Sequence, residues 1–146
     1  MPGSPTDLPD VNIWVALSDD QHLHHPAASA YWSSQRGDLS AFCGVTLLGM
    51  LRILTLPSAM NGNPFTPSEA IARFREFSCL PDVTFLEDSP LVAPRVEAWS
   101  RQPTFTKKLW TDAWIAALAL EHGCRVVSFD ADFAKFPGLD FLLLRP

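Results

Sequence analysis

An apolar strand that runs directly into two carboxylates offers the most suggestive chemistry in this sequence. Residues 126–133 read "VVSFDADF", so Asp130 follows the predicted strand at once and Asp132 lies two residues further on. A strand end is a common place for a turn residue, and turn formation accounts for Asp130 as readily as a functional role does. The functional alternative is a site that residues from elsewhere in the sequence complete.

Two further acids occupy comparable positions. Asp10 ends a short predicted strand in "LPDVNIWVAL", and Asp112 opens the helix predicted over residues 111–123. Each has a structural explanation of its own, because Asp10 can cap the helix that follows it and Asp112 can interact with a helix dipole. Jointly these explanations weaken, since three separate elements would each need an acid at the same sheet edge by chance.

Clustered carboxylates have a chemical consequence. They repel one another and are costly to desolvate unless a cation compensates their charge. Oxygen ligands without a nearby pair of Cys or His residues suit Mg²⁺ or Mn²⁺ rather than zinc. The sequence therefore predicts a divalent-cation site at Asp10, Asp112 and Asp130, provided that the first and fourth strands are neighbours.

Neutral oxygen donors lie close to two of these acids. Asn12 is two residues after Asp10, and Ser128 is two residues before Asp130. They can orient the carboxylates, although ordinary turn hydrogen bonds explain their positions equally well.

Other candidates are weaker. His22, His24 and His25 in "QHLHHP" resemble a ligand cluster, but this segment precedes a helix and is predicted to be a solvated loop. Lys107 and Lys108 come just before the helix of residues 111–123, where they would be either a solvated pair or a contact to a phosphate backbone.

Arg52 lies within a helix predicted over residues 45–55, "VTLLGMLRILT", which reads as nearly wholly buried. A buried arginine needs a partner, for which a carboxylate or a substrate phosphate would serve. Most of the tryptophans are expected to pack in the core: Trp14, Trp32, Trp99, Trp110 and Trp114.

Composition narrows the class of protein. The 146 residues are 47% apolar and 18% charged, which predicts one globular domain over residues 1–146. The net charge of −5 argues against nonspecific adhesion to nucleic acid through a basic surface. The apolar runs are too short for a membrane span and the N-terminus lacks the pattern of a signal peptide, so a cytoplasmic location is expected. Cys43, Cys79 and Cys124 are predicted to be core residues rather than disulfide or zinc ligands.

Strands and helices are predicted to alternate along the chain. The strands are expected near Pro9 and over residues 40–45, 82–87, 124–130 and 140–144, and the helices over residues 25–35, 45–55, 67–77, 93–102 and 111–123. This order predicts an α/β fold with a mainly parallel sheet of four to five strands and helices on both faces. In such folds, ligands bind at the carboxyl ends of strands.

Several residues are expected to mark the ends of these elements. Thr66 and Glu69 have the spacing of a capping box, Thr111 is the expected N-cap of the last long helix, and Gly123 is its expected stop. Pro9 has no N–H, so the first strand should pair imperfectly.

The order of these segments resembles the PIN-domain ribonucleases of the VapC toxin type. The resemblance spans about residues 7–144, and its most specific block is "TDAWIAALALEHGCRVVSFDADF". It implies a PIN-like fold and a Mg²⁺- or Mn²⁺-dependent endoribonuclease that acts on RNA, forms a homodimer and is held inactive by a small VapB-like antitoxin. It assigns Asp10, Asp112 and Asp130 to the metal site and makes Asp132 an additional acid.

One departure from the family pattern concerns the helix of residues 45–55. Many PIN domains carry a glutamate there, where this chain has Gly49, although a branch of VapC-like proteins shares the "GxLR" pattern. The loss implies fewer carboxylates, weaker binding of a second ion and a compensating role for Thr46, Arg52 or Asp132.

Two other functions remain open at this stage. The first is a PIN-like module that binds an antitoxin or RNA without cutting it, which the missing glutamate favours. The second is a phosphoaspartate fold, which is disfavoured because "DAD" follows the late strand instead of the first.

Overall fold

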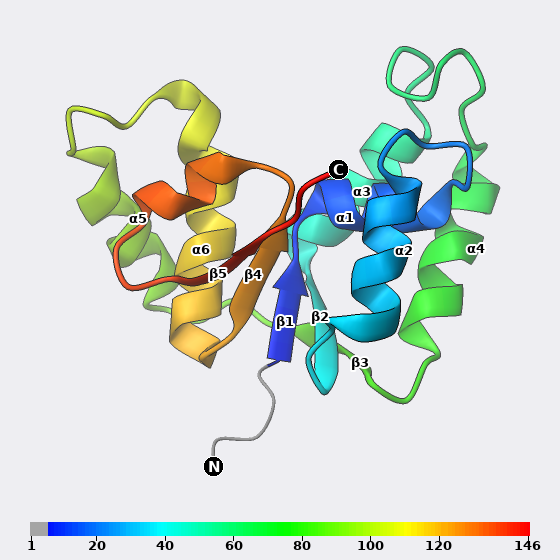
Figure 1. Cartoon of the computed structure of the whole chain (residues 1–146). Helices are drawn as coiled ribbons and strands as arrows, with labels where there is room; N and C mark the ends of the chain where they lie inside the picture. The colour runs from blue at the N-terminus through cyan, green and yellow to red at the C-terminus, as the bar shows by residue number, and fades with distance from the viewer. Residues whose placement is uncertain (1–5) are drawn as a thin grey trace.

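A five-stranded sheet organises the part of the chain described by this computed structural model, residues 6–146 (Figure 1). Its strand order is β3-β2-β1-β4-β5, and every neighbouring pair is parallel. The strands are β1 (Thr6–Pro9), β2 (Leu39–Cys43), β3 (Val83–Leu86), β4 (Arg125–Ser128) and β5 (Asp140–Leu143). The predicted α/β class, the parallel sheet and the adjacency of the first and fourth strands are confirmed.

Helices cover both faces of the sheet (Figure 1). They are α1 (Val11–Ser18), α2 (His25–Ser34), α3 (Gly44–Leu54), α4 (Pro67–Ser78), α5 (Val92–Ser100) and α6 (Trp110–His122), with short 3-10 turns η1 (Lys107–Leu109) and η2 (Ala131–Lys135). Helices α5 and α6 pack on one face, and α1 to α4 lie on the other. No helix within residues 6–146 is both long and apolar enough to cross a membrane.

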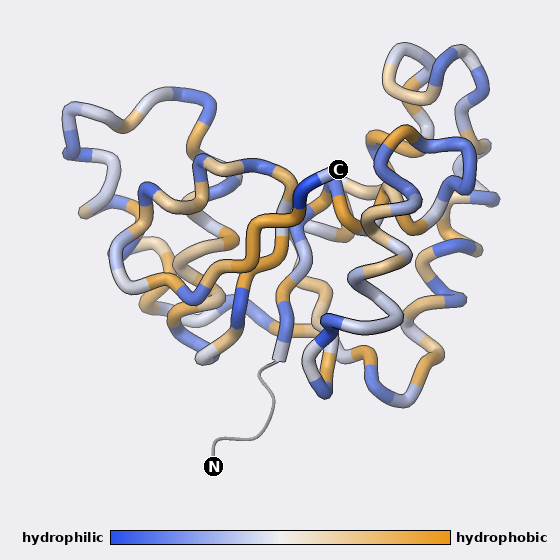
Figure 2. Tube along the Cα trace, viewed as in Figure 1, coloured by the Kyte–Doolittle hydropathy of each residue, from blue (hydrophilic) through white to orange (hydrophobic). Residues whose placement is uncertain are grey.

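The most apolar segments are those enclosed between the layers. Figure 2 shows hydrophobic residues concentrated along β4 and β5, whereas the outer loops are largely hydrophilic. In α6, the run from Ile115 to Ala119 is fully buried against the sheet. Burial of apolar surface is the main favourable contribution to folding.

The short first strand accommodates its proline at the point where one pairing ends. Strand β1 pairs with β2 only at Thr6 and Asp7, but with β4 as far as Pro9. Asp10 N–H then donates to the Val127 carbonyl at 2.8 Å. The N–H that Pro9 lacks would face β2, where pairing has already stopped, so the expected imperfect pairing is found on that side.

Two of the three predicted end signals are confirmed. The Thr66 and Glu69 side chains each accept a hydrogen bond from the other residue's backbone N–H at the start of α4. Gly123 ends α6 with φ 67°, a left-handed conformation that favours glycine. Thr111 is not the N-cap, because η1 leads directly into α6 and the helix already begins at Trp110.

Some predictions about burial are wrong. In α3 only Thr46, Met50 and Leu54 are buried, while Leu48 is 69% exposed and Arg52 is also exposed. The sheet contacts only one side of this helix, so the leucines on its other side face outward.

Two further residues lie at the surface against expectation. Cys79 is exposed at the end of α4, whereas Cys43 and Cys124 are buried, and all three are free thiols. Trp110 is 52% exposed, because it stands on the outer side of the first turn of α6.

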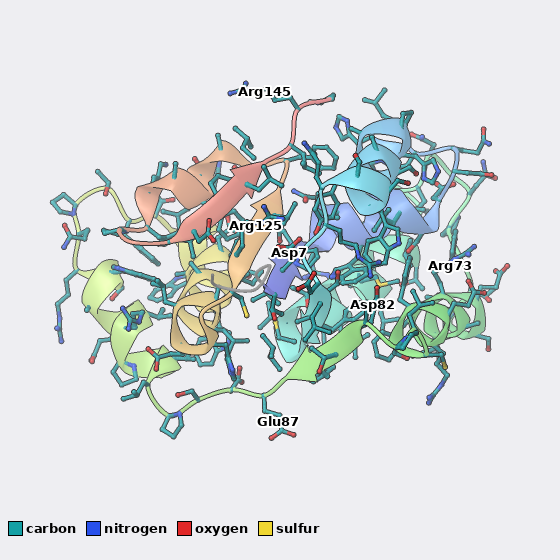
Figure 3. The ribbon with its side chains drawn as sticks, turned by 60° about the horizontal axis from the view of Figure 1, so that its bottom comes forward. Asp7, Arg73, Asp82, Glu87, Arg125 and Arg145 are labelled. Atoms are coloured by element: carbon teal, nitrogen blue, oxygen red, sulfur yellow. The ribbon has the colours of Figure 1, made fainter. Side chains whose placement is uncertain are left out.

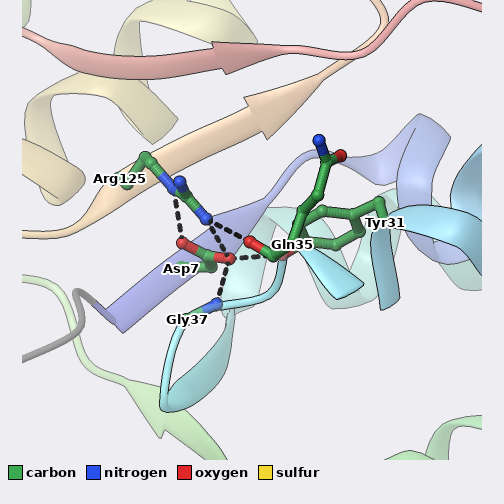
Figure 4. A network of polar contacts seen from close by, with 5 residues as sticks. All are labelled: Asp7, Tyr31, Gln35, Gly37 and Arg125. Atoms are coloured by element: carbon green, nitrogen blue, oxygen red, sulfur yellow. Dashed lines mark hydrogen bonds and ion pairs between the residues drawn. The ribbon is translucent and has the colours of Figure 1, made fainter. Parts of the chain in front are cut away.

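A buried charge network joins β1 to β4 at the amino ends of the strands (Figure 3). Asp7 is fully buried and accepts two hydrogen bonds from the Arg125 guanidinium, at 2.8 and 3.0 Å. It also accepts from the Tyr31 hydroxyl and the Gly37 N–H, and Arg125 donates in addition to the Gln35 carbonyl (Figure 4). Burial and the Asp7 hydrogen bond raise the pKa of Tyr31, so its hydroxyl stays protonated as a donor.

We predict that Asp7→Ala destabilises the fold by roughly 3–5 kcal/mol, because it leaves the Arg125 charge without its buried partner. Urea unfolding followed by circular dichroism measures the loss. The matched control is Glu97→Gln, which breaks an exposed helix pair with Arg101 at 3.5 Å and should cost about 0.5 kcal/mol or less. Equal effects of the two variants would contradict a structural role for Asp7.

Candidate active site

The parallel pairing of β1 with β4 brings distant acids to one edge of the sheet. Pro9 is opposite Val127, so Asp10 and Ser128 follow side by side at the carboxyl ends of the two strands. Asp130 comes two residues after β4 ends. This is the edge at which parallel α/β folds bind their ligands.

The Asp10 carboxylate accepts hydrogen bonds from two neighbouring residues. Its Oδ1 accepts from the Val11 N–H at 2.7 Å and caps α1, and its Oδ2 accepts from the Ser128 hydroxyl at 2.8 Å. The residue is only 7% exposed. Burial raises the pKa of Asp10, and the hydrogen bond from Ser128 partly offsets that rise. The predicted capping role is confirmed, and it coexists with a position at the sheet edge.

Ser128 links the polar groups of this edge. Its hydroxyl donates to Asp10 and accepts from the Asp130 N–H at 2.9 Å and from the Asn12 side-chain amide at 3.1 Å. The Asn12 carbonyl oxygen in turn faces the Phe129 N–H at 3.4 Å. Ser128 and Asn12 therefore hold both strand ends in a fixed relation, beyond an ordinary turn contact within one loop.

Asp130 also forms a turn, as the structural explanation predicted. Its Oδ1 accepts from the Asp132 N–H at 2.9 Å and caps η2. The Asp132 carboxylate lies 3.2 Å from Lys135, and both side chains are about half exposed.

Asp112 shows that the acids affect one another. It lies in the first turn of α6, where burial and then the negative charges of Asp10, Asp130 and Asp132 raise its pKa to about 7. A carboxyl group with such a pKa binds its proton far more readily than an exposed one. The raised pKa therefore reflects negative charge gathered around Asp112.

These carboxylates are neighbours without forming a closed ligand cage. Within residues 6–146, no three acidic, histidine or cysteine side chains lie close enough together to hold one metal ion. Uncompensated carboxylates repel one another, and an ion at this edge would have to draw them inward. The donor set itself, made of carboxylate and neutral oxygens, fits Mg²⁺ or Mn²⁺.

The remaining residues predicted for the site are Thr46, Lys107, Lys108 and Arg52. The Thr46 hydroxyl accepts from the Cys43 N–H at 2.9 Å in a capping arrangement at the start of α3, so its bonds are to the backbone rather than to an acid. Lys107 and Lys108 are exposed in η1, immediately before α6. Arg52 is exposed on α3, so the argument that it needs a buried partner does not hold.

Close packing of α3 against α1 accounts for the glycine at position 49, where many PIN domains carry a glutamate. A Cβ atom on Gly49 would lie 2.5 Å from Cγ2 of Val11, the residue that follows Asp10. Helices α1 and α3 thus approach each other closely at this position, and the Val11 side chain occupies the space that a larger residue would need.

The three histidines are half-buried and make specific contacts, unlike the residues of the solvated loop that was predicted. His25 Nδ1 lies 2.7 Å from the Ala16 carbonyl, and His22 Nδ1 accepts from the His24 N–H at 3.0 Å. The His24 ring stacks on Phe129, with ring centroids 4.7 Å apart.

An open cleft of about 630 Å³ adjoins the acids. It is lined by Asn12, Asp19, His22, Leu23, His24, Ala59, Met60, Asn61, Phe129, Asp130 and Ala131. Sequence reasoning missed Asp19, Asn61 and Phe129, because they belong to three separate loops whose meeting no local pattern indicates.

Comparison with known proteins identifies the family of this chain. The family described as "PIN domain" matches residues 8–139. The chain belongs to the PIN-domain family. It is 31% identical to Ribonuclease VapC41 of Mycobacterium tuberculosis over 150 residues, which cover 94% of this chain and 97% of that protein. It is 34% identical to Ribonuclease VapC39 of the same organism, over 88% of this chain and 91% of that protein.

Solved structures agree with the PIN fold. The crystal structure of M. tuberculosis VapC20, described as a sarcin-ricin loop cleaving toxin, superposes with a TM-score of 0.72 at 18% identity, over 97% of this chain and 100% of that chain. VapBC2 from Rickettsia felis, bound to a promoter DNA fragment, gives 0.63 at 11% identity, over 96% and 99%. The resemblance to VapC-type PIN domains read from the sequence is confirmed.

We predict that Gly49→Ala lowers the free energy of unfolding by about 1–3 kcal/mol, because the new methyl group overlaps Val11. The added substitution Val11→Ala should recover part of this loss, which a double-mutant cycle in urea would measure. Gly44→Ala is the control, since a Cβ at Gly44 meets no atom within 4 Å. A Gly49→Ala variant as stable as Gly44→Ala would contradict the close approach.

A second prediction concerns pH in metal-free buffer containing EDTA. The pKa of Asp112 is about 7 in the folded chain against an ordinary value of 3.8, so the folded state binds the extra proton between these values. Its unfolding free energy should therefore fall, relative to Asp112→Asn, as pH rises from about 4 to about 7, and level off above that. Urea titrations of both proteins at pH 4.5, 6 and 7.5 measure this. A stability difference that does not vary with pH would contradict the raised pKa.

Proposed function

We propose that this chain is a Mg²⁺- or Mn²⁺-dependent endoribonuclease and the toxin of a toxin–antitoxin pair. The observation that carries the proposal is the parallel pairing of β1 with β4, after which the Ser128 hydroxyl bonds to both Asp10 and Asp130 at the carboxyl edge of the sheet. Relatives 31–34% identical over most of the chain are named ribonucleases, which supports the same reaction class.

In the proposed site, Asp10, Asp112 and Asp130 are the metal ligands and Asp132 is an additional acid. A divalent ion held by these residues would supply activation of the attacking water and stabilisation of negative charge on the reacting phosphate. One of the carboxylates orients the attacking water. Ser128 positions Asp10 through its hydroxyl, and the Asn12 amide holds that hydroxyl in place.

Exposed cations near the acids are candidates for contact with the RNA backbone. Lys107 and Lys108 are exposed in the turn that leads to Asp112 and are the proposed phosphate contacts, and Arg52 is a further candidate on α3. Such contacts supply affinity rather than sequence readout. Because the chain has a net charge of −5, its binding to RNA should depend strongly on the bound cation.

The proposed partners are a small VapB-like antitoxin and a second copy of the chain. Several solved structures with this fold are toxin–antitoxin assemblies, among them one from Klebsiella pneumoniae with a TM-score of 0.61 at 18% identity. An apolar surface on α3 and α4 is available for such contacts, with Leu48 69% and Ile71 41% exposed. Exposed apolar surface of this kind is typical of interaction sites.

A second candidate function is a PIN-like module that binds antitoxin or RNA without cleavage. Two observations favour it, namely Gly49 in place of an acid and the absence of a preformed three-ligand group within residues 6–146. The two functions differ in one measurable property, which is Mg²⁺-dependent turnover.

We predict that Asp10→Asn abolishes RNA cleavage while the chain stays folded. Asparagine caps helices as well as aspartate does, so α1 should remain intact, but a neutral amide is a poorer ligand for a divalent ion. Ser128→Ala should lower the rate by about 10- to 100-fold, since Asp10 loses the hydroxyl that positions it. Cleavage of total RNA with and without Mg²⁺, with sequencing of the new ends, measures both effects.

The matched control is Asp38→Asn, an exposed acid that precedes β2 at the opposite end of the sheet. It should cut as the parent does. Full activity of Asp10→Asn would rule out the proposed site, and a parent chain that binds RNA but cuts none with either ion would favour the binding module.

A further inference from the structure

The cleft beside the acids shares two of its residues with the proposed site. Asn12 bonds to Ser128, which holds Asp10, and Asp130 is itself a proposed ligand; both line the cleft. A group bound in the cleft would therefore lie next to a phosphate held at the carboxylates. Its volume of about 630 Å³ lies within the usual range for ligand pockets.

The walls of the cleft suit a flat ring. The stacked rings of His24 and Phe129 form one side, with an angle of 30° between their planes. Met60, which is 4% exposed, also lines the cleft, from the loop after α3. Proteins that recognise single-stranded RNA use aromatic and histidine rings in this way to hold unstacked bases.

The charges of the cleft disfavour a second phosphate. The residues that line it include the carboxylates of Asp19 and Asp130 and no lysine or arginine. Burial lowers the pKa of His22, which disfavours a positive charge on this ring. A neutral group that donates hydrogen bonds fits such walls better than an anion does.

Asp19 is held in place by its own turn. Its Oδ1 accepts from the Gln21 N–H at 3.0 Å, and its carbonyl accepts from the His22 N–H at 3.0 Å. A carboxylate has room for about four hydrogen bonds, so it retains acceptor capacity after the bond to Gln21. It is thus a fixed acceptor, on a different loop from the proposed metal ligands.

We propose that this cleft binds the base next to the scissile phosphate and that Asp19 selects guanine there; this rests on the proposed ribonuclease function. Guanine alone among the four bases carries two adjacent donors, N1–H and the 2-amino group, which match the two oxygens of a carboxylate. Adenine and cytosine place a donor beside an acceptor, and uracil has one donor between two acceptors. Asn61, which also lines the cleft, has an amide that can donate and accept a further hydrogen bond.

The first experiment measures binding without chemistry. The Asp10→Asn chain, which is expected not to cut, is titrated in Mg²⁺ buffer with short single-stranded RNAs that are all uridine except for one central guanosine, inosine or adenosine. Inosine lacks the 2-amino group, so the guanosine RNA should bind about tenfold more tightly than the other two. Equal affinities would overturn the assignment. This comparison needs no change at Asp19.

The second experiment tests Asp19 itself on the otherwise unaltered chain with Mg²⁺. Sequencing of the cut ends in total RNA should show guanine enriched at one position beside the cut. Asp19→Asn should reduce this enrichment about tenfold while cleavage continues. Asp20→Asn is the matched control, because this neighbouring acid is exposed and does not line the cleft. Enrichment of another base, or an equal effect of both variants, would overturn the guanine assignment.

Failure of this inference is separable from failure of the proposed function. If the parent chain cuts RNA and Asp10→Asn does not, the nuclease stands whatever base is preferred. If the parent cuts nothing, the ribonuclease proposal falls and the guanine subsite, which rests on it, falls as well.

Discussion

The parallel pairing of β1 with β4 is the constraint on which the candidate site depends. Asp7 and Arg125, 118 residues apart, are opposite each other at the amino end and form a buried ion pair. At the carboxyl end, the Ser128 hydroxyl bonds to Asp10. Each strand is only four residues long, so these two contacts bracket the whole pairing. A slip by one residue would leave a buried charge unpaired and move Asp10 away from Ser128, so the same register secures both the fold and the site.

Structural and functional explanations of the acids are not alternatives in this fold. Asp10 caps α1 with one oxygen and takes the Ser128 hydroxyl with the other, and Asp130 caps η2 while its N–H bonds to the same hydroxyl. Local hydrogen bonds of this kind stabilise ionised carboxylates and reduce the cost of gathering them. Burial nevertheless raises the pKa of Asp10, and burial together with the neighbouring negative charges raises the pKa of Asp112 to about 7.

Much of the fold could be predicted because its signals are local. Short segments of sequence contain the signals for the alternating strands and helices, for the Thr66–Glu69 capping box and for the end of α6 at Gly123. Because crossovers between parallel strands are right-handed, few sheet topologies are then possible. The features that could not be predicted depend on contacts between distant segments. Arg125 reads as an ordinary surface residue until its opposite strand is known. The exposure of Leu48 and Cys79 depends on which helix faces lack a covering layer, and the cleft exists only because three loops meet.

The charge balance of the site follows from how its helices pack. Where Val11 of α1 meets α3, only a glycine fits without movement, so Gly49 contributes no acid. The carboxylates of the edge then come from Asp10 after β1, Asp112 in α6 and the turn after β4. Fewer acids repel one another less and leave the apo fold less strained, but they also attract a cation less strongly. An edge of this composition on a chain of net charge −5 repels a polyanion until its carboxylates are compensated. Cation binding and RNA binding should therefore be coupled here, with the cation acting as part of the binding surface as well as of the chemistry.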